Sequence, residues 1–252
     1  MPFPFKCLGV SLALTLCACG SPARPDGPIP VQQFPAHQSA ATHPLVIVLP
    51  GRGDDLGDLA TSGIVQAIQR AWPQADVLLA GATLGYYTDG NVAQHLREDV
   101  IAPAHRRGYR EIWLCGASMG GMGALLYDER YPRDVTGLVL LAPYMGDPDL
   151  IAQVAAEGGP ARWDPGPVPA RVDRNNYQHE LWRGVKDWRD PAQAGRIWLS
   201  GGTADRFVRS TRMLASLLPQ GHYVKEDGGH AWPVWDAGAA EIFTMIAAAH
   251  VC

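Results

Sequence analysis

The chain has 252 residues, a formal charge of −4 at pH 7, 47% hydrophobic residues and 18% charged residues. This composition is typical of an ordinary globular protein, and the length allows one large domain or two small ones. The mild acidity, together with the lack of any basic cluster in the sequence, argues against a nucleic-acid partner.

Residues 1–18 are typical of an export signal. A lysine near the start precedes an apolar stretch at residues 8–16, and small residues follow. This stretch is too short to cross a bilayer as a permanent helix. The sequence therefore predicts an exported protein.

The end of this signal, "LCACG" at 16–20, resembles the lipobox of bacterial lipoproteins. In that family the cysteine is acylated and becomes the mature N-terminus. The resemblance therefore implies lipidation of Cys19 and a membrane-anchored protein on the periplasmic or outer-membrane side. Cys17 departs from the pattern, because the family more often has Ala, Ser or Thr there. The alternative is simple cleavage near Ala18 without a lipid.

If Cys19 carries a lipid, two cysteines remain in the mature chain. Cys115 lies in a predicted buried strand, where we expect it to act as a small apolar side chain. The alternative, in an exported protein, is a disulfide between Cys115 and Cys252.

Residues 19–43 contain five prolines and few large apolar side chains. This composition predicts an extended tether between the lipid anchor and a folded domain. The alternative is a partly ordered arm that lies on the domain and is docked by Val31 and Phe34.

From residue 44 onward, short apolar runs alternate with segments of helical pattern. The predicted strands are 44–51, 75–82, 111–118, 135–144, 195–202 and 222–229, and the predicted helices are 56–73, 91–108, 119–132, 208–221 and 234–251. We expect a kink near Pro103. Continuous apolar strands that alternate with helices predict one α/β domain over 44–252, with a mostly parallel sheet covered on both faces.

Residues 146–195 interrupt this alternation with a segment rich in proline and tryptophan. We expect helices near 148–157 and 176–188. We interpret the segment as a lid insertion over the carboxyl ends of the strands, where ligands bind in open α/β sheets. Its tryptophans either shape a pocket for an apolar or aromatic substrate group or fasten the lid to the sheet; they are Trp163, Trp182 and Trp188.

The stretch "GASMG" at 116–120 fits the pattern G-x-S-x-G and lies between a predicted strand and a predicted helix. A sharp turn at this point holds a serine in a strained conformation with its hydroxyl exposed to substrate. The flanking Gly116 and Gly120 are needed because the strand and the helix pass close to each other. The sequence therefore predicts Ser118 as a nucleophile, and the alternative is a glycine-rich turn with a surface serine.

A nucleophilic serine needs a base and an acid that orients the base, which follow later in the chain in this type of fold. His230 follows the sixth predicted strand, and Asp205 follows the fifth. Both lie on loops at the same edge of the predicted sheet as Ser118. We therefore expect a Ser118, His230 and Asp205 triad, with Asp147, after the fourth strand, as the second choice for the acid.

An oxyanion hole needs two backbone donors, one of which is the residue after the nucleophile, Met119. The loop after the first strand, "LPGRGDD" at 49–55, is expected to supply the second. We expect the N–H of Arg52, with the neighbouring glycines as alternatives. The Arg52 guanidinium either faces an anionic substrate group or pairs with a neighbouring aspartate in solvent.

Three stretches, in order, resemble the α/β-hydrolase superfamily. "GASMGGMGALLYDERYP" at 116–132 is similar to the elbow of esterase D-like and feruloyl-esterase-like enzymes, and "GGHAWPVW" at 228–235 is similar to the run that carries their catalytic histidine. "LPGRGDD" departs from many relatives, since Pro50 stands where they have His. The usual first two strands have no obvious counterpart before Leu45.

These observations predict a serine hydrolase for a small-molecule ester, which works through an acyl-enzyme without a cofactor. No His, Cys or Asp cluster has the spacing of a metal site. Tyr86, Tyr87 and Trp232 are expected to contact the substrate. A peptidase, a thioesterase or a lysophospholipase with the same triad stays open, as does a catalytically inactive homologue that binds a ligand.

Overall fold

The computed structural model describes residues 27–250 apart from 41, 89 and 171. The predicted signal segment at 1–18, the predicted lipidation site Cys19 and the C-terminal Cys252 lie outside the described residues. Cys115 is a buried free thiol, and burial raises its pKa.

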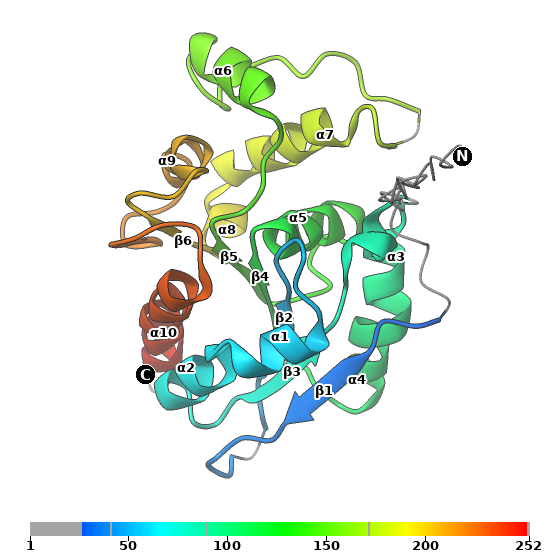
Figure 1. The fold of residues 1–252 in the computed structure, drawn as a ribbon, viewed down its shortest axis with the longest axis vertical. Helices are drawn as coiled ribbons and strands as arrows, with labels where there is room; N and C mark the ends of the chain where they lie inside the picture. The colour runs from blue at the N-terminus through cyan, green and yellow to red at the C-terminus, as the bar shows by residue number, and fades with distance from the viewer. Residues whose placement is uncertain (1–26, 41, 89, 171, 251–252) are drawn as a thin grey trace, which may run out of the picture.

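A seven-stranded sheet forms the centre of the molecule, in the order β1-β3-β2-β4-β5-β6-β7 (Figure 1). The strands are β1 (Val31–Phe34), β2 (Leu45–Leu49), β3 (Asp76–Ala80), β4 (Ile112–Ala117), β5 (Gly137–Leu141), β6 (Ile197–Gly202) and β7 (Tyr223–Glu226). β2 to β7 pair in parallel, whereas β1 pairs with β3 antiparallel. Every residue of β2 to β5 is buried because helices cover both faces, as the continuous apolar runs predict.

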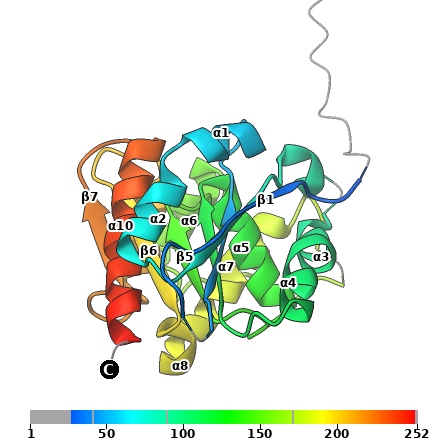
Figure 2. The same ribbon diagram turned by 90° about the horizontal axis from the view of Figure 1, so that it is seen from below.

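Helices α2 (Ile64–Ala71) and α10 (Trp232–Ala249) lie side by side over one face of the sheet (Figures 1 and 2). The opposite face is covered by α3 (Val92–His95), the π-helical turn Leu96–Ile101, α4 (Ala102–Arg106), α5 (Met119–Arg130) and α7 (Tyr177–Gly184). Short elements connect these layers: α1 (Leu56–Thr61), the 3₁₀ turns Leu84–Tyr87 and Val185–Arg189, α6 (Pro148–Ala156), α8 (Pro191–Ala194) and α9 (Val208–Ala215).

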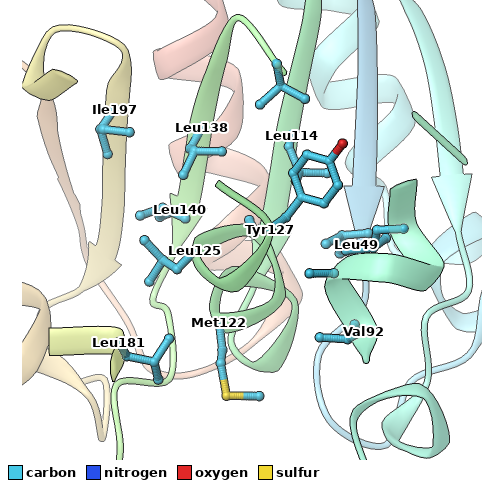
Figure 3. Packing of buried hydrophobic residues seen from close by; sticks show 14 of the residues in the cluster. Leu49, Val92, Leu114, Met122, Leu125, Tyr127, Leu138, Leu140, Leu181 and Ile197 are labelled. Atoms are coloured by element: carbon cyan, nitrogen blue, oxygen red, sulfur yellow. The ribbon is translucent and has the colours of Figure 1, made fainter. Parts of the chain in front are cut away.

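The core under α5 fixes the helix that begins at the predicted nucleophile. Met122, Leu125 and Tyr127 of α5 lie among leucines of the sheet and of α7 (Figure 3). These leucines are Leu49, Leu114, Leu138, Leu140 and Leu181. All are less than 10% exposed, so α5 cannot shift without losing packing on the sheet.

Two predicted helices are interrupted in the structure. The helix predicted at 56–73 divides into α1 and α2 at Gly63, whose φ of +104° ends one helix before the next begins. The helix predicted at 91–108 contains a π-helical turn directly before Pro103. Pro103 has no N–H to donate to the preceding turn, which favours the wider turn there.

The prediction that residues 19–43 form a tether outside the domain is wrong for the described part of that segment. β1 adds an edge strand to the sheet, and the arm makes further hydrogen bonds to the domain. The Ile29 N–H donates to Asp99 at 3.0 Å, and the Ala36 N–H donates to Asp76 at 2.7 Å. The folded domain therefore begins before residue 44, in line with the alternative of a docked arm.

The insertion at 146–195 is partly built into the domain. Trp163 and Trp182 are fully buried, and Trp188 is 6% exposed. The indole N–H of Trp182 donates to the carbonyl of Met145 at 2.8 Å. All three tryptophans belong to the buried core that includes the sheet and α5, which agrees with the alternative that they fasten the insertion to the domain.

No helix among the described residues is long and apolar enough to cross a membrane. Within the same residues, no group of three or more His, Cys, Asp or Glu side chains is arranged to hold a metal ion.

Candidate active site

Ser118 occupies the sharp turn between β4 and α5. Its backbone has φ 53° and ψ −112°, a conformation that is strained for a residue with a side chain. The Ser118 N–H donates to the Leu141 carbonyl at 2.9 Å, and the Ser118 carbonyl accepts from Tyr144 at 3.0 Å. The end of β5 and the residues after it therefore hold the strained turn in place on both sides.

Gly116 and Gly120 allow the strand, the helix and the first loop to approach one another. A Cβ on Gly116 would lie 2.3 Å from the backbone of Gly120. A Cβ on Gly120 would lie 2.5 Å from the carbonyl oxygen of Leu49 and 2.7 Å from that of Pro50. Side chains at these positions would separate Ser118 from the loop that follows β2.

The structure brings Ser118, His230 and Asp205 together. His230 Nε2 lies 2.9 Å from Ser118 Oγ, and His230 Nδ1 lies 2.8 Å from Asp205 Oδ2 and 3.0 Å from Oδ1. Asp205 is 2% exposed and also accepts a hydrogen bond from the Phe207 N–H at 2.7 Å. A nucleophile bonded to a base, with a buried acid behind the base, is the arrangement required for nucleophilic catalysis by serine.

Asp147, the second choice for the acid, is exposed and does not contact His230. Its carboxylate accepts hydrogen bonds from Gln178 and Tyr144, both at 2.8 Å. These bonds, that from Gln178 foremost, lower the pKa of Asp147. Asp147 thus connects α7 to Tyr144, whose N–H donates to the Ser118 carbonyl.

The loops that carry the acid and the base are joined by backbone hydrogen bonds. The Thr203 N–H donates to Glu226, and the Ala204 N–H donates to Gly228, both at 2.8 Å. Because β6 and β7 are parallel neighbours, both loops leave the same edge of the sheet. The backbone hydrogen bonds between the two loops therefore hold Asp205 and His230 in contact.

Two aromatic rings pack against the His230 imidazole. The rings of Phe207 and Trp235 each lie edge-on to it, with centroids 4.8 Å away. The ring of Tyr144 in turn lies edge-on to Phe207, with centroids 5.6 Å apart. The sequence analysis did not identify Phe207 or Tyr144 as site residues, although Trp235 belongs to the "GGHAWPVW" stretch.

The two expected oxyanion donors flank the close approach of Gly120 to the carbonyls of Leu49 and Pro50. Met119 is the first residue of α5, where backbone N–H groups have no partner within the helix. Arg52 and Gly53 form the middle of a turn closed by the Asp54 N–H, which donates to Gly51 at 3.3 Å. The φ of +95° at Gly53 suits this turn.

The side chain of Arg52 is exposed, and it forms no ion pair with any described residue. The neighbouring carboxylates have other partners, because Asp55 caps α1 and Asp54 accepts a hydrogen bond from Trp232 at 3.1 Å. The expectation that Arg52 pairs with a neighbouring aspartate is therefore wrong.

The three residues expected to contact substrate have different surroundings. Tyr86 is 5% exposed and donates to the Pro28 carbonyl at 3.0 Å, so it holds the N-terminal arm and is not placed at the triad. Tyr87 packs on α5, where a Cβ on Gly123 would meet its hydroxyl oxygen at 2.4 Å. Burial raises the pKa of both phenols. Trp232 lies close to the triad, edge-on to Trp235 at 5.1 Å.

A sequence model of the family described as serine aminopeptidase, S33, matches residues 86–164, which include Ser118. No curated protein sequence matches the chain. Three solved structures are similar over 88% of this chain. A ferulic acid esterase is matched over 99% of its own chain, with a TM-score of 0.59 and 14% identity. Est1E from Butyrivibrio proteoclasticus is matched over 93%, with a TM-score of 0.56 and 14% identity.

The third structure is FphF, a fluorophosphonate-binding serine hydrolase of Staphylococcus aureus, matched over 99% of its chain with a TM-score of 0.60 and 12% identity. This chain has a mostly parallel sheet flanked by helices, and the similar structures are α/β-hydrolases. The agreement extends over nearly the whole of each chain, so that the fold class predicted from the sequence is confirmed and the chain has the α/β-hydrolase fold.

Proposed function

We propose that the protein is a serine hydrolase that cleaves small carboxylic esters through an acyl-enzyme. The observation that carries this proposal is the continuous contact from Ser118 Oγ through His230 to the buried Asp205. Buried polar groups rarely align in this order for structural reasons alone, whereas nucleophilic catalysis requires it. The similar solved structures include esterases and a serine hydrolase, which supports the same class of reaction.

In the first half of the proposed reaction, Ser118 Oγ attacks the ester carbonyl carbon while His230 Nε2 takes the hydroxyl proton. The C–O bond to the alcohol then breaks, and His230 returns the proton to the leaving oxygen. In the second half, His230 takes a proton from a water molecule that attacks the carbonyl carbon of the acyl-enzyme. The bond from that carbon to Ser118 Oγ then breaks, His230 returns the proton to Oγ, and the carboxylic acid leaves. Asp205 holds the imidazole and stabilises its charged form throughout.

The negative oxygen of each tetrahedral intermediate accepts hydrogen bonds from backbone N–H groups. We assign these to Met119 and Arg52, because the turn that contains Arg52 follows the Leu49 and Pro50 contact with α5. Losing one such donor costs about 3–4 kcal/mol of transition-state stabilisation. The exposed Arg52 side chain is free to meet an anionic group on the substrate.

A peptidase is the second candidate, because the matching family model is described as a serine aminopeptidase. The match covers the nucleophile turn and the beginning of the insertion, but not Asp205 or His230. Aminoacyl p-nitroanilides therefore belong in the substrate panel beside esters. Turnover of the anilides faster than that of matched esters would favour the peptidase.

We also propose that the protein is exported and anchored to a membrane through a lipid on Cys19. The support is the "LCACG" sequence at 16–20. Expression of the full chain with labelled palmitate in a bacterial host tests this proposal. We expect label in the wild type and none in Cys19→Ser, and label-free wild type in the soluble fraction would refute the anchor.

The test of the proposed reaction is intact mass after treatment with a fluorophosphonate. We expect one adduct on the wild type and on Ser216→Ala, an exposed serine in a different part of the chain, and none on Ser118→Ala. A p-nitrophenyl ester series from acetate to palmitate then defines the acyl group. An unlabelled wild type that hydrolyses no ester would refute the proposal in favour of a ligand-binding protein.

A further inference from the structure

The second oxyanion donor lies on an exposed turn that has little support of its own. Arg52 and Gly53 are both exposed, and nothing lies within 4 Å of the position of a Cβ on Gly53. The single hydrogen bond within the turn, from Asp54 N–H to Gly51, is long at 3.3 Å. Oxyanion donors must lie within about 2.7–3.1 Å of the developing charge, so the turn needs an external support.

One side-chain hydrogen bond supplies a support from the other end of the chain. The Trp232 indole N–H donates to Asp54 Oδ2 at 3.1 Å across 178 residues of sequence. Trp232 is the first residue of α10 and follows His230 by two positions. A hydrogen bond to a carboxylate is stronger than one between neutral groups. The bond therefore joins the oxyanion turn directly to the segment that carries the base.

The packing around this bond leads to the imidazole. A Cβ on Gly51 would lie 2.9 Å from Asp54 Oδ2 and 3.7 Å from the ring of Trp235. Trp235 in turn lies edge-on to Trp232, at 5.1 Å, and to His230, at 4.8 Å. The turn, the indole pair and the imidazole thus form one continuous set of contacts.

We propose that Asp54 and Trp232 are positioning residues, whose hydrogen bond holds the Gly51–Asp54 turn at the distance from Ser118 that the oxyanion requires. This inference rests on the proposed function. Neither residue acts on the reacting atoms in this role. The positioning role of Trp232 differs from the substrate contact expected from the sequence.

Kinetics of conservative variants test the role. Trp232→Phe removes the N–H and keeps an aromatic ring, whereas Asp54→Ala removes the acceptor. We expect each to lower kcat for p-nitrophenyl acetate about 10- to 100-fold, since a displacement of about 1 Å in the site costs up to about 100-fold. KM should change less than about threefold, because ground-state binding does not use the oxyanion donors.

Three further variants separate positioning from a general structural effect. Asp54→Asn keeps an acceptor oxygen and should retain kcat within about threefold of the wild type. The double variant should be no slower than the slower single variant, because both remove the same bond. Trp198→Phe removes an indole at the other end of the sheet and should leave kcat unchanged, because Trp198 stacks on His222 away from the triad.

Two readouts show whether the turn itself is affected. A trifluoromethyl ketone, which forms an oxyanion with the nucleophile, should bind the two slow variants more weakly by the same factor as the loss in kcat. Hydrogen exchange should accelerate at residues 50–54 and stay constant in the sheet. Two outcomes would overturn this inference and leave the proposed function standing. One is unchanged kcat and unchanged exchange in Trp232→Phe and Asp54→Ala, and the other is a loss confined to KM or to the urea midpoint. A wild type without esterase activity or adduct would overturn the proposed function as well.

Discussion

Gly120→Ala tests whether close approach of α5 to the end of β2 builds the site. Judged by propensity alone, alanine in a helix is more stable than glycine by about 1 kcal/mol. In the structure the added Cβ would meet Leu49 O at 2.5 Å, Pro50 O at 2.7 Å and Leu49 C at 2.8 Å, which are all backbone atoms. No side-chain rotation relieves these contacts, and overpacking of this kind costs about 1–3 kcal/mol.

We therefore expect Gly120→Ala to lose about 1–2 kcal/mol of unfolding free energy where propensity predicts a gain. Relief of the clash requires a movement of roughly 1 Å between α5 and the loop after β2, so kcat should fall about 10- to 100-fold. Urea unfolding followed by circular dichroism and esterase kinetics measure the two effects.

The matched control for this prediction is Gly184→Ala. Gly184 also lies in a helix, with φ −59° and ψ −37°, and a Cβ there would contact nothing closer than 3.4 Å. This variant should gain about 0.4–1 kcal/mol and keep its activity. If Gly120→Ala is as stable and as active as Gly184→Ala, the close approach of α5 to the end of β2 does not build the site, and the reasoning fails.

Three further predictions concern the acid, the insertion and a carboxyl group near the site. Asp205→Asn should lower kcat about 10⁴-fold while Asp147→Asn stays within a few-fold, and equal losses in an ester assay would contradict the choice of acid. Trp182→Ala should lose about 3–5 kcal/mol of unfolding free energy in urea without raising KM for acetate esters, because the side chain is fully buried. Burial raises the pKa of Asp236 to about 7 from its ordinary 3.8, so the native state binds an extra proton between these values, and stability falls as the pH rises through that window. Asp236→Asn should flatten this pH dependence of the urea midpoint, and an unchanged slope would refute the assignment.

β2 to β6 could be predicted from the sequence because each is a short apolar run that is almost entirely buried. β1 could not, because "VQQF" has little apolar pattern and its first three residues are exposed. Its place depends on the free edge of β3, to which it pairs from Val31↔Ala80 to Phe34↔Val77. Pairing of this kind is a property of the assembled sheet. The local sequence indicated a docked arm through Phe34, which packs on the core, but it did not indicate a strand.

The positions of the triad residues followed from topology, because parallel strands bring the loops at their carboxyl ends to one edge. The surroundings of the triad did not follow from the topology. Phe207, in the loop after β6, packs on His230, and Tyr144 reaches Phe207 from the loop after β5. Tyr86 was expected at the substrate on account of its place after β3, yet its hydroxyl binds the Pro28 carbonyl of the arm. Contacts between distant segments decide each of these roles.

The docked arm also limits how an anchored enzyme would meet its substrate. The hydrogen bonds of Ile29 and Tyr86 fix the chain to the domain from about residue 28 onward. If Cys19 carries the proposed lipid, only nine residues lie between it and Ile29. A chain of ten steps spans at most about 35 Å, which is close to the diameter of a small domain. The domain would therefore remain within about its own diameter of the membrane surface, so that esters in or near that surface reach the site more readily than esters far from it.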